Sequence, residues 1–172
     1  MKLKEYILSC IWSPLLIIQF LLVFIFGVYN EAEIDFLMYA GWIIWAISVI
    51  FGFLPIIVLK KEGGVQNGES YVHTKTLVTS NIYSIIRHPQ YTAGILLSLA
   101  MILISQNWLI TAMGVVVILF LYIDIVWTDK FEIEKFGDEY KKYIEEVPRT
   151  NFILGIIRIL KHSKANKTDK KL

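Results

Sequence analysis

Residues 91–127 read YTAGILLSLAMILISQNWLITAMGVVVILFLYIDIVW, an apolar run of 37 residues with a single charge, at Asp124. One helix of this length would extend about 55 Å, whereas the hydrocarbon core of a bilayer is about 30 Å thick. Ser105-Gln106-Asn107 forms a polar break within the run. We therefore predict two helices, 89–104 and 108–127, joined by a tight turn. The first helix is short, and the sequence leaves open whether it crosses the bilayer at a tilt or is re-entrant.

Two more apolar runs precede this hairpin, at residues 7–29 and 36–59, and neither contains a charge. Each is long enough to span a bilayer. The first is too long for a secretory signal peptide, and no small-residue cleavage site follows it. Of the 172 residues, 56% are hydrophobic and only 19% are charged, which excludes a disordered chain and a nucleic-acid-binding tail protein. Cys10 is the single cysteine, so no internal disulfide forms, and we expect its side chain to be buried in packing.

The basic residues predict the orientation of the four helices. With spans at these positions, all 17 Lys and Arg residues fall on one side of the membrane, whereas residues 30–35 contain only acidic charges. Positive charge accumulates on the cytoplasmic side. The sequence thus predicts an all-α, single-domain integral membrane protein with four transmembrane helices and both termini in the cytoplasm.

Two segments are polar enough to lie outside the bilayer, residues 60–88 and 128–172. Apolar residues between 131 and 147 recur at helical spacing. Gly137-Asp138 interrupts them, and we expect Gly137 to cap the end of one helix and Asp138 to be the N-cap of the next. The stretch 153–161 is apolar with two basic residues, and it can lie flat on the membrane. The last ten residues, polar and basic, are predicted to be disordered.

The densest polar cluster is Arg87-His88-Pro89-Gln90-Tyr91. Pro89 suits the first position of a helix, which puts Arg87 and His88 at the start of a membrane helix. A helix N-terminus favours an anion such as a carboxylate. The alternative is that both side chains simply anchor the helix at the membrane interface.

Two acidic residues near the end of the last span are further candidates. Asp129 sits where it could face the Arg87–Tyr91 corner and hold an ammonium or sulfonium cation. Asp124 lies one turn deeper, where a carboxylate is costly unless it is paired. No metal-ligand spacing, nucleophile elbow, Walker motif or dinucleotide fingerprint occurs, so we expect neither a metal nor a nucleic-acid partner.

Residues 77–83 read LVTSNIY and residues 87–94 read RHPQYTAG. With FGDEY at 136–140 and VPR at 147–149, they resemble, in order and spacing, the isoprenylcysteine carboxyl methyltransferase and phospholipid methyltransferase superfamily. The resemblance covers about residues 77–151. Where that family has a glycine, this chain has Asn81, and where the family has two glutamates, it has Asp129-Lys130.

The resemblance implies an integral membrane methyltransferase that uses S-adenosyl-L-methionine and takes a lipophilic acceptor from the bilayer. It implies that backbone at Leu77 and Val78 lines the adenine pocket and that Asp129 holds the amino group of the cofactor. Other implied cofactor-binding residues gather around the Arg-His-Pro motif: Tyr83, Arg87, His88, Pro89 and Tyr91. Arg87, His88 and Arg149 are the candidate catalytic residues, with either Arg87 or Arg149 orienting an anionic acceptor.

The acceptor stays open between an isoprenylcysteine-type carboxylate, a phospholipid amine and a small thiol, and we favour the carboxylate. A carboxylate or thiolate acceptor needs no general base, so we expect His88 to shape the cofactor site. Two other classes compete with an enzyme. One is a non-catalytic membrane scaffold or sensor, suggested by the changed acidic pair, and the other is a small transporter, for which no inverted repeat is visible.

Overall fold

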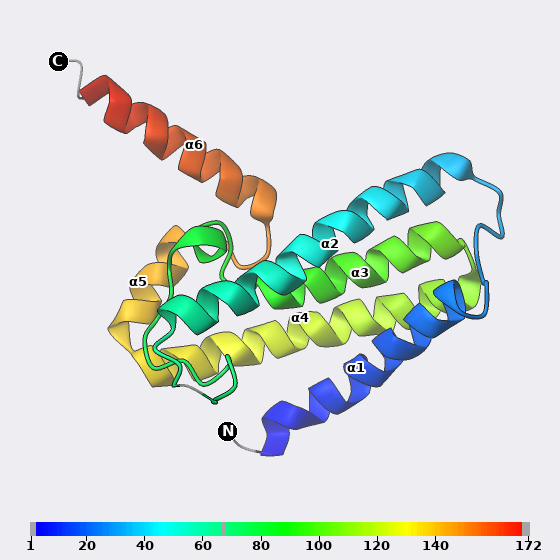
Figure 1. Cartoon of the computed structure of the whole chain (residues 1–172), viewed down its shortest axis with the longest axis horizontal. Coiled ribbons are helices and arrows are strands. Elements are labelled where there is room, and N and C mark those ends of the chain that lie inside the picture. Colours follow the sequence, from blue (N-terminus) through cyan, green and yellow to red (C-terminus); the bar gives the residue numbers. More distant parts are fainter. Residues whose placement is uncertain (1–2, 67, 170–172) are drawn as a thin grey trace. The chain divides into compact units, whose positions relative to one another are not determined.

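The computed structural model describes residues 3–66 and 68–169, and within these residues all regular structure is helical (Figure 1). The described residues form six α-helices and a short 3₁₀ helix: α1 (Leu3–Phe24), α2 (Asp35–Glu62), η1 (Asn81–Ser84), α3 (Pro89–Ser105), α4 (Trp108–Phe136), α5 (Asp138–Glu146) and α6 (Phe152–Asp169). Among the helices of the described residues, α1, α2 and α4 are long and apolar enough to cross a membrane, and α3 is a shorter apolar helix. The chain is therefore an all-α integral membrane protein.

Two of the predicted helix ends are wrong. Helix α1 ends at Phe24, five residues before the predicted Tyr29, and the chain turns at Gly27, which has a φ of +72°. The amide of Val28 returns to the Leu22 carbonyl at 3.0 Å, which closes the helix end. Helix α4 continues nine residues past the predicted end at Trp127, and it stops only before Gly137, where φ is +60°.

Contacts divide the chain into two compact units. The first comprises Met1–Phe53 and Gln90–Phe131, and the second comprises Leu54–Pro89 and Glu132–Leu172. Since the chain passes between the units three times, their existence does not decide how many domains fold independently. The single-domain expectation stays a prediction.

In the first unit, the loop after α1 and the turn between α3 and α4 lie at the same end. The Asn30 amide donates to the Ile104 carbonyl at 2.9 Å, and Gln106 Nε2 donates to Asn30 Oδ1 at 2.7 Å. Asn107 Nδ2 donates to Glu31 Oε2 at 2.6 Å. The hairpin predicted at the polar break is confirmed, and it meets the acidic loop, as a four-helix topology requires.

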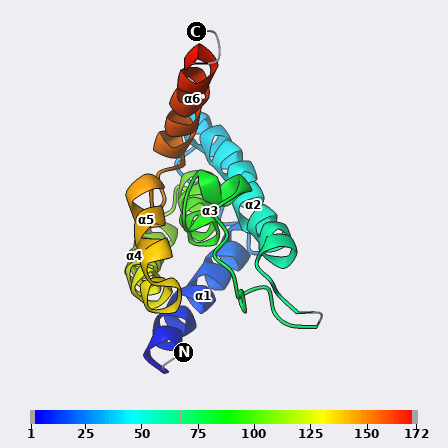
Figure 2. The same cartoon turned by 90° about the vertical axis from the view of Figure 1, so that its left-hand side faces the viewer.

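Helices α2 and α3 run antiparallel along this unit. An added Cβ at Gly41 would lie 2.7 Å from Ile104 Cγ1, whereas one at Gly52 would lie 3.7 Å from Ala93 Cβ. Contact with α2 thus extends from the end of α3 back to its start. The side-by-side course of α2, α3 and α4 can be followed in both ribbon views (Figures 1 and 2).

Two polar side chains inside this apolar unit are paired with each other. Gln19 and Ser98 are fully buried, and Ser98 Oγ donates to Gln19 Oε1 at 3.0 Å. Gln19 Nε2 also donates to the Ile110 carbonyl at 3.2 Å, which links α1 to α4. Such bonds are worth roughly 1 kcal/mol within membranes. Cys10, by contrast, is exposed on α1, so the expectation that it is buried is wrong.

The second unit has a small core on α5. Tyr140, Tyr143 and Val147 form it, and four partly buried side chains pack against them: Leu77, Ile133, Phe136 and Ile144. The apolar spacing predicted between 131 and 147 is therefore the inner face of α5 and of the end of α4. The break at Gly137 is confirmed, although Gly137 rather than Asp138 occupies the N-cap position.

The C-terminal segment is helical beyond the predicted limit. Helix α6 continues to Asp169, so the prediction of disorder is wrong for residues 163–169, and residues 170–172 lie outside the described residues. Extending a helix that already exists costs little, because nucleation is the expensive step.

Candidate functional site

The Arg-His-Pro motif lies where the sequence predicts it. Pro89 is the first residue of α3, a position at which its missing N–H costs nothing. Arg87 and His88, immediately before it, expose only 7% and 6% of their surface. A buried arginine and histidine are not simple interface anchors, because an anchor keeps its polar head in water.

Two main-chain hydrogen bonds join this motif to a segment about 60 residues later in the sequence. The Arg87 amide donates to the Pro148 carbonyl at 3.0 Å, and the His88 amide donates to the Arg149 carbonyl at 3.2 Å. The motif at 87–89 and the motif at 147–149 are therefore neighbours in the second unit. Arg149 itself is half-buried.

Two arginines from outside α5 cap its C-terminus. Arg87 Nη1 donates to the Ile144 carbonyl at 2.9 Å, and Arg158 Nη1 donates to the Glu146 carbonyl at 2.6 Å. Carbonyls in the last turn of a helix have no partner within it, and the partial negative charge there favours cations. Since α5 has no basic residue in its own last turn, both cations come from other segments.

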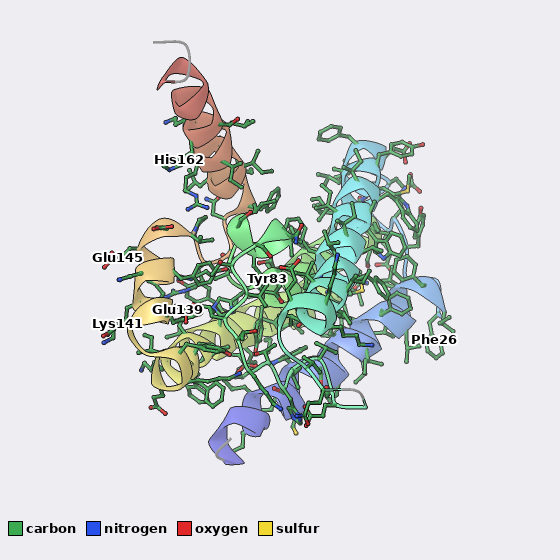
Figure 3. The ribbon with its side chains drawn as sticks, turned by 60° about the vertical axis from the view of Figure 1, so that its left-hand side comes forward. Phe26, Tyr83, Glu139, Lys141, Glu145 and His162 are labelled. Carbon is green, nitrogen blue, oxygen red and sulfur yellow. The ribbon has the colours of Figure 1, made fainter. Side chains whose placement is uncertain are left out.

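His88 and Tyr83 contact the aromatic face of α5. The Tyr140 hydroxyl lies 3.5 Å from His88 Nε2, a long contact, and the Tyr143 hydroxyl donates to the Tyr83 carbonyl at 2.6 Å. Figure 3 shows Tyr83 on the inner side of this unit, whereas Lys141 and Glu145 extend outward from α5.

Tyr83 is a neutral hydroxyl in this setting. Burial, followed by the nearby Tyr143, Tyr71 and Glu132, raises the pKa of Tyr83 well above its ordinary value of 10. All of these causes disfavour the phenolate. Tyr83 can therefore donate or accept a hydrogen bond at physiological pH, but it cannot act as a general base.

Leu77 and Val78 lie in the loop that leads to η1. Leu77 packs against the α5 core, and Val78 is 7% exposed. At the end of the same loop, Asn81 has a φ of +53°, a conformation that asparagine tolerates better than most residues. A positive φ at this position suits glycine as well as asparagine. Glu62 accepts hydrogen bonds from Ser80 Oγ and, at 2.8 Å, from Asn81 Nδ2.

Asp129 and Tyr91 belong to the first unit. Asp129 is 5% exposed on α4, and Lys130 beside it is exposed. The Tyr91 hydroxyl lies 3.0 Å from Thr128 Oγ1, one residue before Asp129. Asp129 is buried and Lys130 is exposed, which fits the choice of Asp129 as the residue that takes the place of the family's acidic pair. That Asp129 faces Arg87 stays a prediction.

Asp124 has the partner that its depth demands. Trp12 Nε1 donates to Asp124 Oδ2 at 2.9 Å, and Ser9 Oγ lies within 3.4 Å of the same oxygen. Asp124 therefore fastens α1 to α4 within the first unit. The sequence indicates that a partner is required, but not which of the many residues on α1 supplies it.

Three further side chains contact the motif residues or hold them in place, and sequence reasoning does not assign them to the site: Tyr140, Tyr143 and Arg158. Both tyrosines belong to the apolar stripe, and Tyr140 also belongs to the FGDEY motif, but neither pattern indicates contact with His88 or Tyr83. Arg158 Nη2 donates to the Ser84 carbonyl at 2.5 Å, and nothing in its sequence surroundings signals this contact. Across residues 3–66 and 68–169, no group of three or more His, Cys, Asp or Glu side chains could hold a metal ion.

Known proteins give two matches. The model of the family described as phospholipid methyltransferase matches residues 36–139, well over half of the chain. A "Protein-S-isoprenylcysteine O-methyltransferase" of Schizosaccharomyces pombe is 25% identical over 151 residues, which cover 83% of this chain and 56% of that protein. The chain thus spans little more than half the length of this curated relative, and no solved structure matches it. On the extent of the family match, the chain belongs to the phospholipid methyltransferase family of membrane proteins.

Proposed function

We propose that this protein transfers a methyl group from S-adenosyl-L-methionine to a lipophilic acceptor, and that the acceptor is an isoprenylcysteine-type carboxylate. The observation that carries the proposal is the pairing of Arg87-His88 with Pro148-Arg149 through two main-chain hydrogen bonds. It assembles, in one unit, motif residues that are distant in sequence. The name of the yeast relative supports the choice of acceptor.

The residues present fit the cofactor by their chemistry. An adenosyl group needs an apolar surface, and Leu77, Val78 and the tyrosines of α5 supply one. The carboxylate of the methionine part needs a cation, and Arg87 supplies a buried one. Its ammonium group needs an acid, a role that we assign to Asp129.

The bound cofactor would supply a methyl group on a sulfonium, which a nucleophile displaces in line. Our proposal gives the protein the tasks of orientation, exclusion of water and charge balance. Arg149 orients the acceptor carboxylate, and Arg87 fixes the end of α5 while it contributes positive charge. His88 and the neutral Tyr83 shape the pocket, because a carboxylate nucleophile carries no proton to remove.

Titration calorimetry of S-adenosylhomocysteine into the full chain in detergent tests the cofactor assignment. We expect a dissociation constant near 1 μM, equivalent to about −8 kcal/mol, and at least tenfold weaker binding in Asp129→Ala. Lys130→Ala, at the exposed neighbouring position, is the matched control and should bind like the wild type. Folded wild-type protein that binds nothing would refute the cofactor, whereas Asp129→Ala binding normally would refute only the role of that residue.

Three acceptor probes then distinguish the alternatives. Vesicle-reconstituted protein receives S-adenosylmethionine labelled in the methyl group, together with N-acetyl-S-farnesylcysteine, phosphatidylethanolamine or a short-chain thiol. We expect label in a base-labile methyl ester of the first probe. Label in the amine or the thiol product would refute the carboxylate acceptor while the methyltransferase proposal holds.

A non-catalytic membrane scaffold is the second candidate. One observation favours it, namely an exposed lysine at 130 where the family resemblance places a second acid. That reading predicts that no probe is labelled, and that Lys130→Glu restores cofactor binding to a protein that otherwise lacks it.

A further inference from the structure

Helix α6 lies outside the region that the family model matches, and one of its faces contacts other segments of the second unit, to which it belongs. At Gly155, an added Cβ would overlap the Ile85 carbonyl oxygen, so the helix backbone directly contacts the chain before Arg87. One turn later, Arg158 donates to the carbonyls of Glu146 and Ser84. This inner face is occupied by protein.

The opposite face of α6 is apolar and exposed. At about 100° of rotation per residue, it is centred about half a turn away from Gly155. Five large side chains form this outer face: Ile153, Leu154, Ile156, Ile157 and Leu160, exposed by 60%, 56%, 43%, 42% and 57%. Contiguous exposed apolar side chains of this size mark a contact surface.

The charge of the segment indicates what covers the outer face. From Phe152 onward the chain contains six basic residues and one acidic residue, and five of the six basic residues, all lysines, follow residue 160. Such a segment suits the surface of a bilayer, where the apolar side chains can contact the acyl chains and the lysines can contact anionic headgroups. The apolar part, 152–160, is too short to span, so the helix would lie in the plane of the membrane.

We propose that α6 is an in-plane membrane helix whose outer face enters a lipid bilayer with anionic headgroups. Because the chain already has spanning helices, the bilayer is present at high effective concentration. The inference does not require methyl transfer. It gives α6 two contacts at once, lipid through Ile157 and its neighbours, and the chain before Arg87 through Gly155 and Arg158.

Site-specific fluorescence on the full chain tests this assignment. In a Cys10→Ser background, an environment-sensitive dye is attached at Ile157→Cys, and the protein is placed in nanodiscs with one copy per disc. Lipids with a nitroxide on the acyl chain quench dyes that contact the hydrocarbon. Phe53→Cys, on the exposed side of a predicted span, is the positive reference, and Glu145→Cys, exposed on α5, is the negative one.

We expect quenching at Ile157 to reach at least half of that at Phe53, with little at Glu145. Replacing a third of the phosphatidylcholine by phosphatidylglycerol should raise quenching at Ile157, and 0.5 M salt should reverse the gain. If Ile157→Cys does not fold, Leu160→Cys carries the same test. The proposal is overturned if the dye at Ile157 is not quenched in anionic discs, or if its quenching does not depend on lipid charge. It is also overturned if the dye is shielded from water only in discs that contain two copies of the protein, because a second copy would then cover the outer face.

Discussion

At the scale of single residues, Asn81 shows how a position can tolerate a change of residue type. Its φ of +53° suits glycine and asparagine and strains other side chains, and its amide donates to Glu62. Asn81→Gly and Asn81→Ala both lose the amide, but only alanine adds strain. We expect Asn81→Ala to unfold more easily than Asn81→Gly by about 1 kcal/mol.

Unfolding by sodium dodecyl sulfate in mixed micelles measures this difference. Because both variants lose the same hydrogen bond, the comparison isolates the backbone. Equal free energies of unfolding for the two variants would mean that the left-handed conformation at this position is not required.

Arg158 is a second residue with a separable contribution. Its guanidinium donates to two main-chain carbonyls, those of Glu146 and Ser84. Arg158→Met keeps the length of the side chain and removes the charge and the donors. We expect a loss of about 1.5–3 kcal/mol in the free energy of unfolding, as for hydrogen bonds to charged groups.

The matched control for Arg158 is Lys142→Met, exposed on α5. Surface substitutions of this kind stay within about 0.5 kcal/mol. Mixed-micelle unfolding of both variants checks the prediction, and a similar small effect at both positions would show that the Arg158 contacts contribute nothing to stability.

At the scale of elements, the sequence predicts some helix ends and misses others for identifiable reasons. Hydropathy locates α2 and α3 within three residues of their observed ends, because polar residues flank both. It misses the end of α1, since residues 25–29 are as apolar as the helix itself and the turn depends on the φ of Gly27. It also misses the end of α4, because a change to polar residues marks the exit from the membrane and not the end of a helix.

The contact between α2 and α3 gives a prediction at the same scale. A Cβ at Gly41 would lie 2.7 Å from Ile104 Cγ1 and 3.0 Å from the Ala100 carbonyl oxygen, whereas a Cβ at Gly52 meets only Ala93 at 3.7 Å. Alanine favours helix over glycine by up to about 1 kcal/mol. We expect Gly52→Ala to be neutral or stabilising and Gly41→Ala to be destabilising by about 1–3 kcal/mol.

Both glycines lie within α2, so each variant controls for the helix propensity of the other. Both variants are heated in the same detergent, and the loss of the main size-exclusion peak is measured against temperature. The two midpoint temperatures are then compared. Gly41→Ala with an unchanged midpoint would mean that α3 moves aside at no cost, and that the close approach does not stabilise the helix pair.

At the scale of the whole molecule, the candidate site shows what sequence reasoning reaches. The motif residues are found from spacing and resemblance, and Pro89 starts its helix as predicted. The pairing of residues 87–88 with 148–149 is not found, because it consists of main-chain bonds that leave no trace in side-chain pattern. The partner of Asp124 is missed for a different reason, since Trp12 resembles any other aromatic residue of an apolar run.

The orientation of the chain in the membrane is the remaining prediction at this scale. All Lys and Arg residues fall on one side of a four-helix arrangement, and that side should be cytoplasmic. The structure adds that Glu31 and Asn107 are hydrogen-bonded to each other at 2.6 Å, so both must lie on the same side. Single cysteines in a Cys10→Ser background report the side through an impermeant maleimide on intact cells.

We expect Glu31→Cys and Asn107→Cys to react on intact cells, and Lys61→Cys and Lys142→Cys to react only after permeabilisation. The cysteines at 31 and 107 test two different predictions. The charge rule predicts the side of residue 31, and the hydrogen bond between Glu31 and Asn107 predicts that residue 107 lies on the same side. Reaction of Glu31→Cys without Asn107→Cys would mean that α3 turns back within the bilayer. The reverse pattern is reaction of Lys61→Cys and Lys142→Cys on intact cells, with Glu31→Cys and Asn107→Cys reacting only after permeabilisation. It would keep the four-helix arrangement but invert its orientation, so that the candidate site would lie on the opposite face of the membrane.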